Sequence, residues 1–302
     1  MKIAIAGATG FVGSRLVELL QAQGHQIVVL TRSPQQASNR FPQAQVVGYS
    51  PLKSGAWQES ISGCDAVVNL AGEPIAEKRW TPEQKRTILE SRQIGTQKIV
   101  EAIAAASVKP SVLVSASAIG YYGTSETDKF NENSPAGTDF LAEVCTKWEA
   151  AAQAVTASGT RLVIARLGIV LGENGGALGK MLAPFSAFVG GPIGSGKQWF
   201  SWIHRDDVVK LIIQAINDTQ MQGVYNATAP NPVTMAGFAQ TLGTVMNRPS
   251  WLPVPNFALE AMLGEGAIVV LQGQQVVPTH TLGQGFEFQY PTLQPALKAI
   301  LG

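Results

Sequence analysis

The sequence predicts an α/β protein with a doubly wound parallel sheet and a smaller region at its C-terminal end. Short runs rich in Val and Ile recur through the first half of the chain, and longer segments with helical spacing separate them. Strands that are apolar on both faces and alternate with helices are typical of a parallel sheet covered on both sides. A glycine-rich turn directly after the first strand is the third observation.

The expected elements follow in chain order. Strands are predicted over residues 2–6, 26–31, 66–70, 112–115 and 162–166, and helices over residues 12–23, 82–107 and 140–158. From about residue 172, glycine and proline segments with scattered helices replace this alternation. We therefore expect one domain over residues 1–171, joined by a helix and a strand near 206–230. A smaller region should follow over 172–302, with its own C-terminal domain from about residue 248.

Composition restricts the possible partners. The chain has 302 residues, of which 45% are hydrophobic, and its 22 basic and 21 acidic residues leave a net charge of +1. So balanced a charge offers no electrostatic surface to nucleic acid or an anionic membrane, and we therefore expect a small-molecule substrate. We also expect a monomer or homodimer. Cys64 and Cys145 form neither a disulfide framework nor a metal-ligand spacing, so no metal is expected.

The N-terminal stretch bears on location. MKIAIAGATG runs directly into a strand and a glycine turn, without the basic head, long apolar core and cleavage site of a signal peptide. No apolar run reaches the roughly 20 residues needed to span a bilayer. Because the cysteine pattern indicates a reducing compartment, we expect the cytoplasm or an organelle matrix, and predict a cytoplasmic protein.

The turn Gly7-Ala8-Thr9-Gly10-Phe11-Val12-Gly13 lies between the first strand and the first helix. Glycines there permit a tight turn, close approach of the backbone to a pyrophosphate and close packing of helix on strand, and the helix N-terminus faces the anion. Since the pattern follows a buried strand and precedes a second one, it predicts a Rossmann-type dinucleotide site. Its residues are Gly7, Thr9, Gly10, Phe11, Val12 and Gly13. The alternative is a glycine turn that binds nothing.

The end of the second strand predicts which dinucleotide binds. An NAD site commonly has an Asp or Glu there to hold the adenosine ribose, whereas this chain has Thr31-Arg32-Ser33. An acidic side chain would repel a 2′-phosphate, and arginine can bind it with a charge-assisted fork. We therefore predict NADP(H) as the cofactor, with Thr31 and Arg32 in its site. An arginine that is merely solvated is the alternative.

Two further motifs make the chain similar to the extended short-chain dehydrogenase/reductases, the superfamily of the sugar-nucleotide epimerases and dehydratases. Asn69-Leu70-Ala71-Gly72-Glu73 resembles its NxAG turn, and residues 114–118 followed by Tyr121-Tyr122-Gly123 resemble its SSxxVYG segment. The resemblance implies that Leu70, Ala71 and Gly72 lie beside the adenine ribose and pyrophosphate, and that the backbone near Val170 lies against the nicotinamide. It also implies that Ser117, or alternatively Ser115, is the catalytic serine.

Over nearly its whole length the chain resembles one atypical branch of this superfamily, whose members are called NAD-dependent epimerase-like. Residues 71–75, 190–196, 200–204 and 251–301 carry this likeness, above all GQQVVPTHTLGQGFEFQYPTLQPAL in the tail. The branch has an SR dipeptide at its cofactor site, which implies contact of Arg92 with the diphosphate or the 2′-phosphate. A solvated helix arginine is the alternative. The resemblance implies little about the substrate.

One departure from the superfamily affects the chemistry. Its Tyr acts as the acid/base, and a Lys four residues later binds the nicotinamide ribose and lowers the pKa of that Tyr. Here the two positions hold Leu141 and Cys145. Cys145 as a replacement nucleophile or proton donor is the less favoured reading, because free Cys is among the most buried residue types. The candidate proton donors are Tyr121 and Tyr122, with aromatic packing as the alternative for both.

Three other signals are interpreted as structural. GPIGSGK, residues 191–197, resembles a phosphate-binding loop but is followed by Gln198 instead of Ser or Thr. His204 is expected to be a hydrogen-bonded structural imidazole. The aromatic residues Trp251, Phe257, Phe286 and Phe288 are expected to pack the second region, some of them lining a substrate pocket.

The sequence therefore supports two hypotheses. The leading one is an NADP(H)-dependent oxidoreductase or epimerase-like enzyme that acts on an unidentified carbonyl or hydroxyl substrate, with Ser117 orienting the substrate oxygen. The competing one is a non-catalytic NADPH-binding sensor or scaffold that has lost the chemistry. Leu141 and Cys145 favour the second hypothesis, and Ser117 with the glycine turn favours the first.

Overall fold

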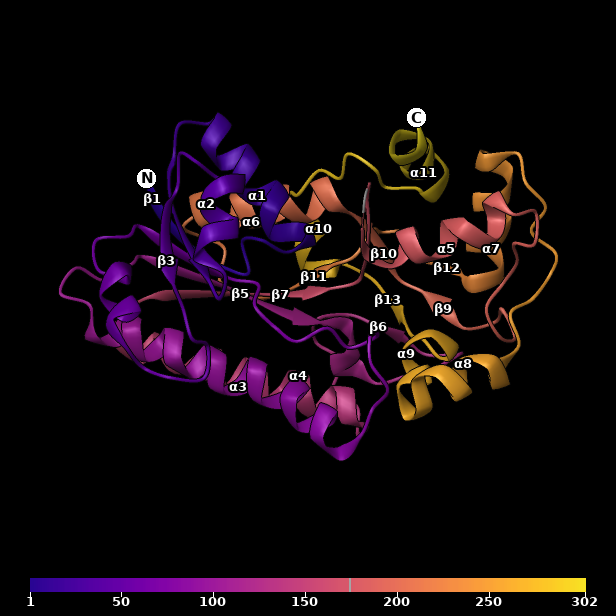
Figure 1. Ribbon diagram of the computed structural model, residues 1–302, viewed down its shortest axis with the longest axis horizontal. Coiled ribbons are helices and arrows are strands. Elements are labelled where there is room, and N and C mark those ends of the chain that lie inside the picture. Colours follow the sequence, from indigo (N-terminus) through magenta and orange to yellow (C-terminus); the bar gives the residue numbers. More distant parts are fainter. Residues whose placement is uncertain (174) are drawn as a thin grey trace.

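The computed structural model describes residues 1–173 and 175–302, and it confirms the predicted α/β fold class (Figure 1). Within the described residues a seven-stranded parallel sheet lies at the centre, in the order β11-β7-β5-β4-β1-β2-β3. Its strands are β1 (Lys2–Ala6), β2 (Gln26–Thr31), β3 (Gln45–Gly48), β4 (Ala66–Asn69), β5 (Val112–Ala118), β7 (Arg161–Leu167) and β11 (Gly223–Ala227). The strand order reverses between β1 and β4, the point where ligands bind in open α/β sheets.

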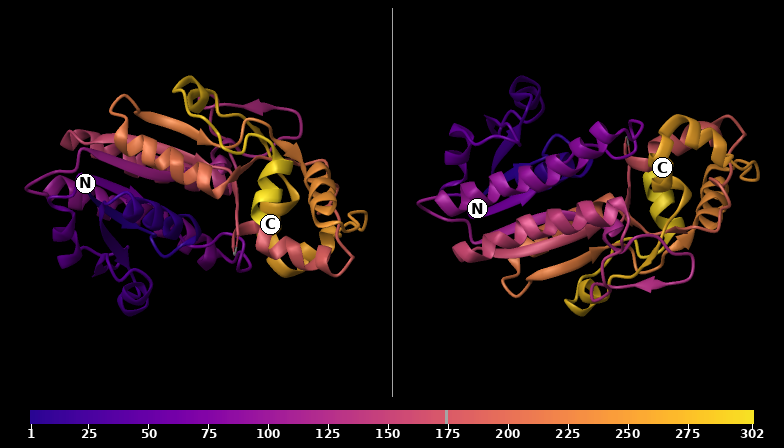
Figure 2. Two further views of the ribbon diagram at one scale, coloured as in Figure 1. Left: turned by 90° about the horizontal axis from the view of Figure 1, so that it is seen from above. Right: turned by 90° about the horizontal axis from the view of Figure 1, so that it is seen from below.

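Helices cover both faces of the sheet because alternate strand residues point to opposite sides. Ile3 and Ile5 of β1 belong to the core beneath α1 (Phe11–Ala22), α2 (Pro34–Arg40) and α6 (Arg205–Asn217). Ala4 and Ala6 belong to the core beneath α3 (Pro82–Ala105) and α4 (Phe140–Gln153). Figure 2 shows the two helical layers on either side of the sheet.

Two short elements of this domain escaped the sequence prediction. The edge strand β3 has the half-exposed sequence QVVG, and β2 is its one partner strand among the described residues. Its four residues therefore carry little of the periodic pattern that marks a buried strand. Helix α2 is a polar seven-residue helix with only Ala37 buried. The expected strand 112–115 also extends to Ala118, and the expected helix 140–158 ends in a 3₁₀ turn over Ala154–Ser158.

The second region has a core of its own. Helices α5 (Gly176–Ser186), α7 (Met235–Met246) and α11 (Leu293–Leu301) pack around Phe185, Trp202, Phe238 and Leu297. Two-stranded pairs join this core to the sheet: β8 (Ile169–Leu171) with β10 (Trp202–His204), β9 (Trp199–Phe200) with β12 (Val233–Thr234), and β6 (Lys129–Phe130) with β13 (Gln275–Val276). The remaining helices are α8 (Asn256–Leu263), α9 (Ile268–Leu271) and α10 (Thr279–Gly283). We propose the division that the sequence suggested, with the second region over 172–302 apart from the sheet elements near 206–230.

The expected packing of the four aromatic residues is wrong. Trp251 and Phe257 are 74% and 73% exposed. Phe286 is buried and packs with Phe288 against the core that the sheet shares with α1 and α6. Phe286 and Phe288 lie there because the carboxylate of Asp207 on α6 accepts hydrogen bonds from the backbone N–H groups of residues 289 and 290. These bonds hold the segment against the first domain.

None of the described helices combines the length and the apolar character that a membrane span needs.

Candidate functional site

The glycine turn is the most closely packed part of the candidate site. Gly7 has a φ of +82°, and a Cβ there would lie 2.7 Å from the carbonyl carbon of Leu70. A Cβ on Gly13 would lie 2.2 Å from the carbonyl oxygen of Gly7. Only glycine therefore allows the turn to lie against the end of β4 and α1 to pack against the turn. The first N–H groups of α1 have no partner within the helix and favour an anion at this end.

A cavity of about 500 Å³ extends from this turn along the ends of β2 and β4. Its volume lies within the range typical of small-molecule sites. Eight predicted cofactor residues line it: Gly7, Thr9, Gly10, Thr31, Arg32, Leu70, Ala71 and Gly72. Nine residues that were not among the predicted cofactor contacts complete the lining: Leu30, Ser33, Gln36, Arg40, Tyr49, Pro51, Glu73, Pro74 and Ser91.

Five predicted cofactor residues do not line this cavity: Phe11, Val12, Gly13, Arg92 and Val170. The ring of Phe11 lies instead against the segment after β8, where a Cβ on Gly175 would be 2.8 Å from it. The Arg205 guanidinium carbon lies 5.0 Å from the centre of the Phe11 ring. The phenylalanine side chain thus joins the glycine turn to the second region.

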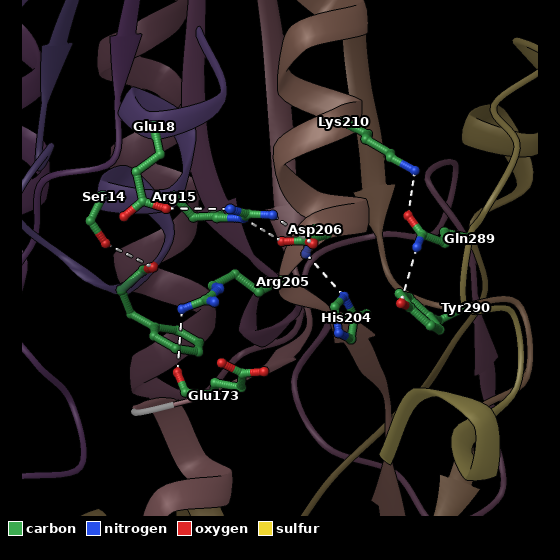
Figure 3. A network of polar contacts seen from close by, with 11 residues as sticks. Ser14, Arg15, Glu18, Glu173, His204, Arg205, Asp206, Lys210, Gln289 and Tyr290 are labelled. Atoms are coloured by element: carbon green, nitrogen blue, oxygen red, sulfur yellow. Dashed lines mark hydrogen bonds and ion pairs between the residues drawn. The ribbon is translucent and has the colours of Figure 1, made fainter. Parts of the chain in front are cut away.

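Figure 3 shows the polar contacts behind this junction. Arg15 of α1 donates from Nε and Nη2 to the carboxylate of Asp206 at 2.9 and 3.2 Å, and Arg205 donates to the carbonyl of Glu173 at 3.3 Å. His204 caps α6, because its Nδ1 accepts the Asp206 N–H at 3.1 Å. Burial lowers the pKa of His204 to about 4, so the ring is neutral and serves as the predicted structural imidazole.

Cationic side chains gather at the β2 end of the cavity. Arg32 is exposed in the cavity wall, and Arg40, in the last turn of α2, donates from Nη1 to the carbonyl of Thr9 at 3.1 Å. Tyr49 lies directly after β3, and its buried hydroxyl has no hydrogen-bond partner among the described residues. Burial raises the pKa of Tyr49 to about 12, so the phenol is neutral and able to donate.

These features fit a dinucleotide that carries an extra phosphate. The glycine cradle and the free helix amides suit a pyrophosphate, and two guanidinium groups beside an unsatisfied phenol suit a further phosphate. Sequence reasoning missed Arg40 and Tyr49 because Arg40 is the last residue of α2 and Tyr49 follows β3, the two elements it had not predicted. The stretch VVGY, read as a short edge strand, is the signal that could have located Tyr49.

Arg92 lies just beyond the cavity wall. Its Nη1 donates to the carbonyls of Glu73 and Ile88 at 2.9 and 3.2 Å, and a Cβ on Gly72 would lie 3.0 Å from its guanidinium carbon. The guanidinium also lies over the ring of Trp148, 5.2 Å from its centre. Burial lowers the pKa of Arg92, an effect that the nearby Cys145 and Glu73 oppose.

A buried ionic network lies at the carboxyl ends of β5 and β7. Ser117 Oγ donates to Glu149 Oε1 at 2.6 Å, and Arg166 binds both carboxylate oxygens of Glu149 at 2.8 Å. Ser117 and Ser115, the alternative serine two residues earlier on β5, are each 1% exposed. Ser115 donates to the carbonyl of Ala116. Of the two serines, Ser117 is the one whose hydroxyl the Glu149–Arg166 ion pair orients.

The two candidate tyrosines differ in their hydrogen bonds. Tyr122 donates to Asn226 Oδ1 at 2.7 Å and accepts from Arg166 at 3.0 Å, and burial raises its pKa to about 12. Tyr121 is half-buried, with the guanidinium carbon of Arg166 3.3 Å from its ring centre, and its hydroxyl has no hydrogen-bond partner in the described part of the chain. Of the two phenols, only that of Tyr122 is thus engaged by side chains among the described residues.

On α4, the two positions where the superfamily has its Tyr and Lys are occupied by apolar or neutral side chains in the protein interior. Leu141 belongs to an apolar cluster with Trp80 and Val144, and Cys145 is 3% exposed. Burial raises the pKa of Cys145 to about 11, so its thiol is neutral at physiological pH. Among the described residues no group of three His, Cys, Asp or Glu side chains is placed to hold a metal ion.

Comparison with known proteins places this geometry in a family. The model of the NAD dependent epimerase/dehydratase family matches residues 3–228. The chain belongs to this family. A second model, the Domain of unknown function (DUF1731), matches residues 254–300, which agrees with the distinctive tail that the sequence showed. The resemblance inferred from the motifs is therefore confirmed.

Several family members are similar to the whole chain. The chloroplastic "Epimerase family protein SDR39U1 homolog" of Arabidopsis thaliana is 51% identical over 100% of this chain and 87% of its own, and human SDR39U1 is 38% identical over 100% of both. The crystal structure of human SDR39U1 with NADPH is 39% identical, has a TM-score of 0.90 and shares 99% of each chain. A Bacillus cereus UDP-glucuronic acid 4-epimerase with NAD (TM-score 0.79, 16% identity) shows the fold alone.

Proposed function

We propose that this protein binds NADP(H) in the cavity at the glycine turn and acts as an oxidoreductase or epimerase-like enzyme on a carbonyl or hydroxyl group. One observation carries the cofactor: the wall of a single cavity joins the glycine turn to Arg32 and Arg40. The similar human protein that holds NADPH supports the same assignment. When bound, the nicotinamide supplies or accepts a hydride, and the protein's own side chains orient the substrate and move the proton.

Ser117 orients the substrate oxygen. Its hydroxyl hydrogen is held by the Glu149 carboxylate, so the serine oxygen is left to accept a hydrogen bond from a substrate hydroxyl. Tyr121, whose ring lies against the Arg166 guanidinium, is the proton donor or acceptor, with its hydroxyl as the reacting group. Tyr122 holds Arg166 and Asn226 in place.

Titration calorimetry with NADPH and NADH tests the cofactor assignment. We expect tight binding of NADPH, weaker binding of NADH, and a matching rise in the thermal unfolding temperature. A ligand at about 100 times its dissociation constant stabilises the native state by roughly 2.7 kcal/mol, which such a scan detects readily. If neither dinucleotide binds at millimolar concentration, the proposed function is wrong.

A non-catalytic NADPH sensor is the second candidate, and the packed Leu141 and Cys145 are the observation that favours it. A screen of carbonyl compounds and nucleotide sugars with stoichiometric NADPH separates the two candidates. Cofactor oxidation that disappears in Tyr121→Phe supports the enzyme. Intact NADPH binding, without turnover of any compound in the wild type, supports the sensor.

A further inference from the structure

The ring of Phe11 lies in a socket formed by three glycines of the second region. A Cβ on Gly172, Gly175 or Gly176 would lie 3.1, 2.8 or 2.9 Å from a carbon atom of that ring. The three glycines lie between the end of β8 and the first residue of α5. We call these three residues the glycine socket.

The ring, and not the backbone, requires glycine at two of these positions. Only Gly176 has a φ in the left-handed region, at +66°, whereas Gly175 has an extended φ of 169° that any residue can adopt. The three atoms nearest to a Cβ on Gly175 all belong to Phe11. At Gly172 the ring and the side chain of Arg205 fill the space that a Cβ would need. The socket is therefore shaped to the Phe11 ring.

The backbone of Phe11 belongs to the dinucleotide turn. Phe11 is the first residue of α1, and Gly10 before it lines the cofactor cavity. The N–H of Phe11 is one of the helix amides that have no partner within the helix and favour an anion. One residue thus has its main chain at the proposed pyrophosphate site and its side chain in the second region.

Polar contacts hold the two sides of this junction together (Figure 3). The guanidinium carbon of Arg205, at the start of α6, lies 5.0 Å from the centre of the Phe11 ring, and its Nη1 donates to the carbonyl of Glu173 at 3.3 Å. Asp206 accepts from Arg15 of α1 at 2.9 Å. Helix α6 therefore binds both the helix that follows the turn and the segment that carries the socket.

The socket also lies close to the edge of the sheet where a ligand is expected. Strand β8 begins two residues after the carboxyl end of β7, and ligands bind at this edge in open α/β sheets. A dinucleotide that extends past the turn along the edge therefore also meets the strand that leads into the socket.

We propose that Phe11 couples dinucleotide binding to the position of α5. While the ring occupies the glycine socket, the turn and the start of α5 form one unit, and a disengaged α5 leaves the turn without this support. A ligand that contacts both sides of the junction stabilises the engaged arrangement, and that arrangement in turn strengthens binding of the ligand. This inference rests on the proposed function, in which Phe11 is a positioning residue.

Hydrogen exchange with and without NADPH tests the coupling. In the wild type we expect NADPH to slow amide exchange in α5 about fivefold or more, although no residue of α5 lines the described cavity. In Phe11→Ala this protection should disappear, while NADPH affinity falls by no more than about tenfold, because the amides that bind the anion belong to the main chain. Phe257→Ala is the matched control that should keep the protection, since its ring is 73% exposed.

A double-mutant cycle provides the second readout. Gly175→Ala should lower NADPH affinity about fivefold or more in the wild-type background, because the new Cβ displaces the ring. In the Phe11→Ala background the same change should alter the affinity by less than about twofold, because the ring is gone. A ring that merely stabilises the fold would give this non-additivity in the unfolding temperature of the cofactor-free protein and none in NADPH affinity.

Three results would overturn the inference. They are NADPH binding to the wild type without slower exchange in α5, equal protection of α5 in Phe11→Ala, and additive effects of the two substitutions on NADPH affinity. If Phe11→Ala does not fold, Phe11→Leu replaces it in both measurements, since leucine is smaller than phenylalanine and leaves room beside Gly175. If the wild type does not bind NADPH, the proposed function fails, whereas failure of the inference alone leaves that binding intact.

Discussion

Ser117 on β5 donates a 2.6 Å hydrogen bond to Glu149 on α4, and Glu149 is held in turn by a bidentate contact with Arg166 on β7. The side chains of Arg166 and Glu149 are only 4% and 11% exposed. This pair fixes the direction of the Ser117 hydroxyl and, through the guanidinium, the plane of the Tyr121 ring. The candidate catalytic groups are thus positioned by a buried ion pair.

Glu149→Gln should destabilise the protein by about 3 kcal/mol, because it leaves the buried Arg166 without a counter-charge. Urea denaturation measures the effect. Glu143→Gln on the same helix is the control, since its pair with Lys147 is exposed and should contribute less than about 1 kcal/mol. Equal losses in the two variants would contradict the role of the buried pair.

His204 makes stability depend on pH. Burial lowers its folded pKa to about 4, below the usual 6.5 of an unfolded histidine. Below pH 6.5 the imidazole of the unfolded chain therefore binds a proton, whereas the folded imidazole stays neutral until about pH 4. The contribution of His204 to the free energy of unfolding is complete at pH 7 and is lost as the pH falls toward 4. The loss is on the order of 3 kcal/mol.

His204→Asn tests this linkage, because asparagine retains an acceptor for the cap of α6 but does not titrate. The difference in free energy of unfolding between wild type and variant should shrink or reverse between pH 7 and pH 4. A difference that stays constant over this range would rule out His204 as the source.

Tyr49→Phe and Tyr122→Phe should have opposite effects on stability. The Tyr49 hydroxyl is buried without a partner among the described residues, so its removal should raise the free energy of unfolding of the cofactor-free protein by about 1 kcal/mol. The Tyr122 hydroxyl joins Arg166 and Asn226, so its removal should cost roughly 1–3 kcal/mol. NADPH affinity should fall in Tyr49→Phe if the phenol serves the cofactor.

Arg32→Asp should reverse the preference between the two dinucleotides. We expect NADPH affinity to drop at least tenfold while NADH affinity is kept or rises, because the acid repels a 2′-phosphate and accepts ribose hydroxyls. Calorimetric dissociation constants for both ligands provide the measurement. An unchanged ratio would move the 2′-phosphate away from Arg32, and Arg40→Gln would then be the next variant to measure.

Gly13→Ala should destabilise the protein by more than about 2 kcal/mol, because its Cβ would lie 2.2 Å from the Gly7 carbonyl oxygen and α1 would have to move. Gly179→Ala in α5 is the control, since, apart from its chain neighbours and the nearby backbone of its own helix, no atom of the described residues lies within 4 Å of its added Cβ. That change should be neutral or stabilise the helix by up to about 1 kcal/mol. Thermal unfolding of both variants distinguishes a packing effect from a general intolerance of alanine.

Much of this architecture could be predicted because its signals are local. The sheet strands β1, β2, β4, β5 and β7 are apolar on both faces, and the glycine turn has a spacing that few other structures require. The missed elements β3 and α2 are short and half-exposed, and the residues that follow or end them, Tyr49 and Arg40, were missed with them. The prediction that Trp251 and Phe257 pack in the second region failed for a different reason. The hydrophobic character of a side chain does not determine whether that side chain is buried.

Local patterns in the sequence were sufficient to predict the fold class, the turn that can accept a pyrophosphate, the arginine at the end of β2 and the absence of the Tyr and Lys from α4. Which side chains lie together could be learned from the folded structure alone. Glu149 and Arg166 come from different elements, and Arg92 on α3 lies over the ring of Trp148 on α4. Those contacts depend on the packing of distant segments, and no local pattern encodes them because hydrogen bonds and ion pairs act over only a few ångströms in space, whatever the separation along the chain.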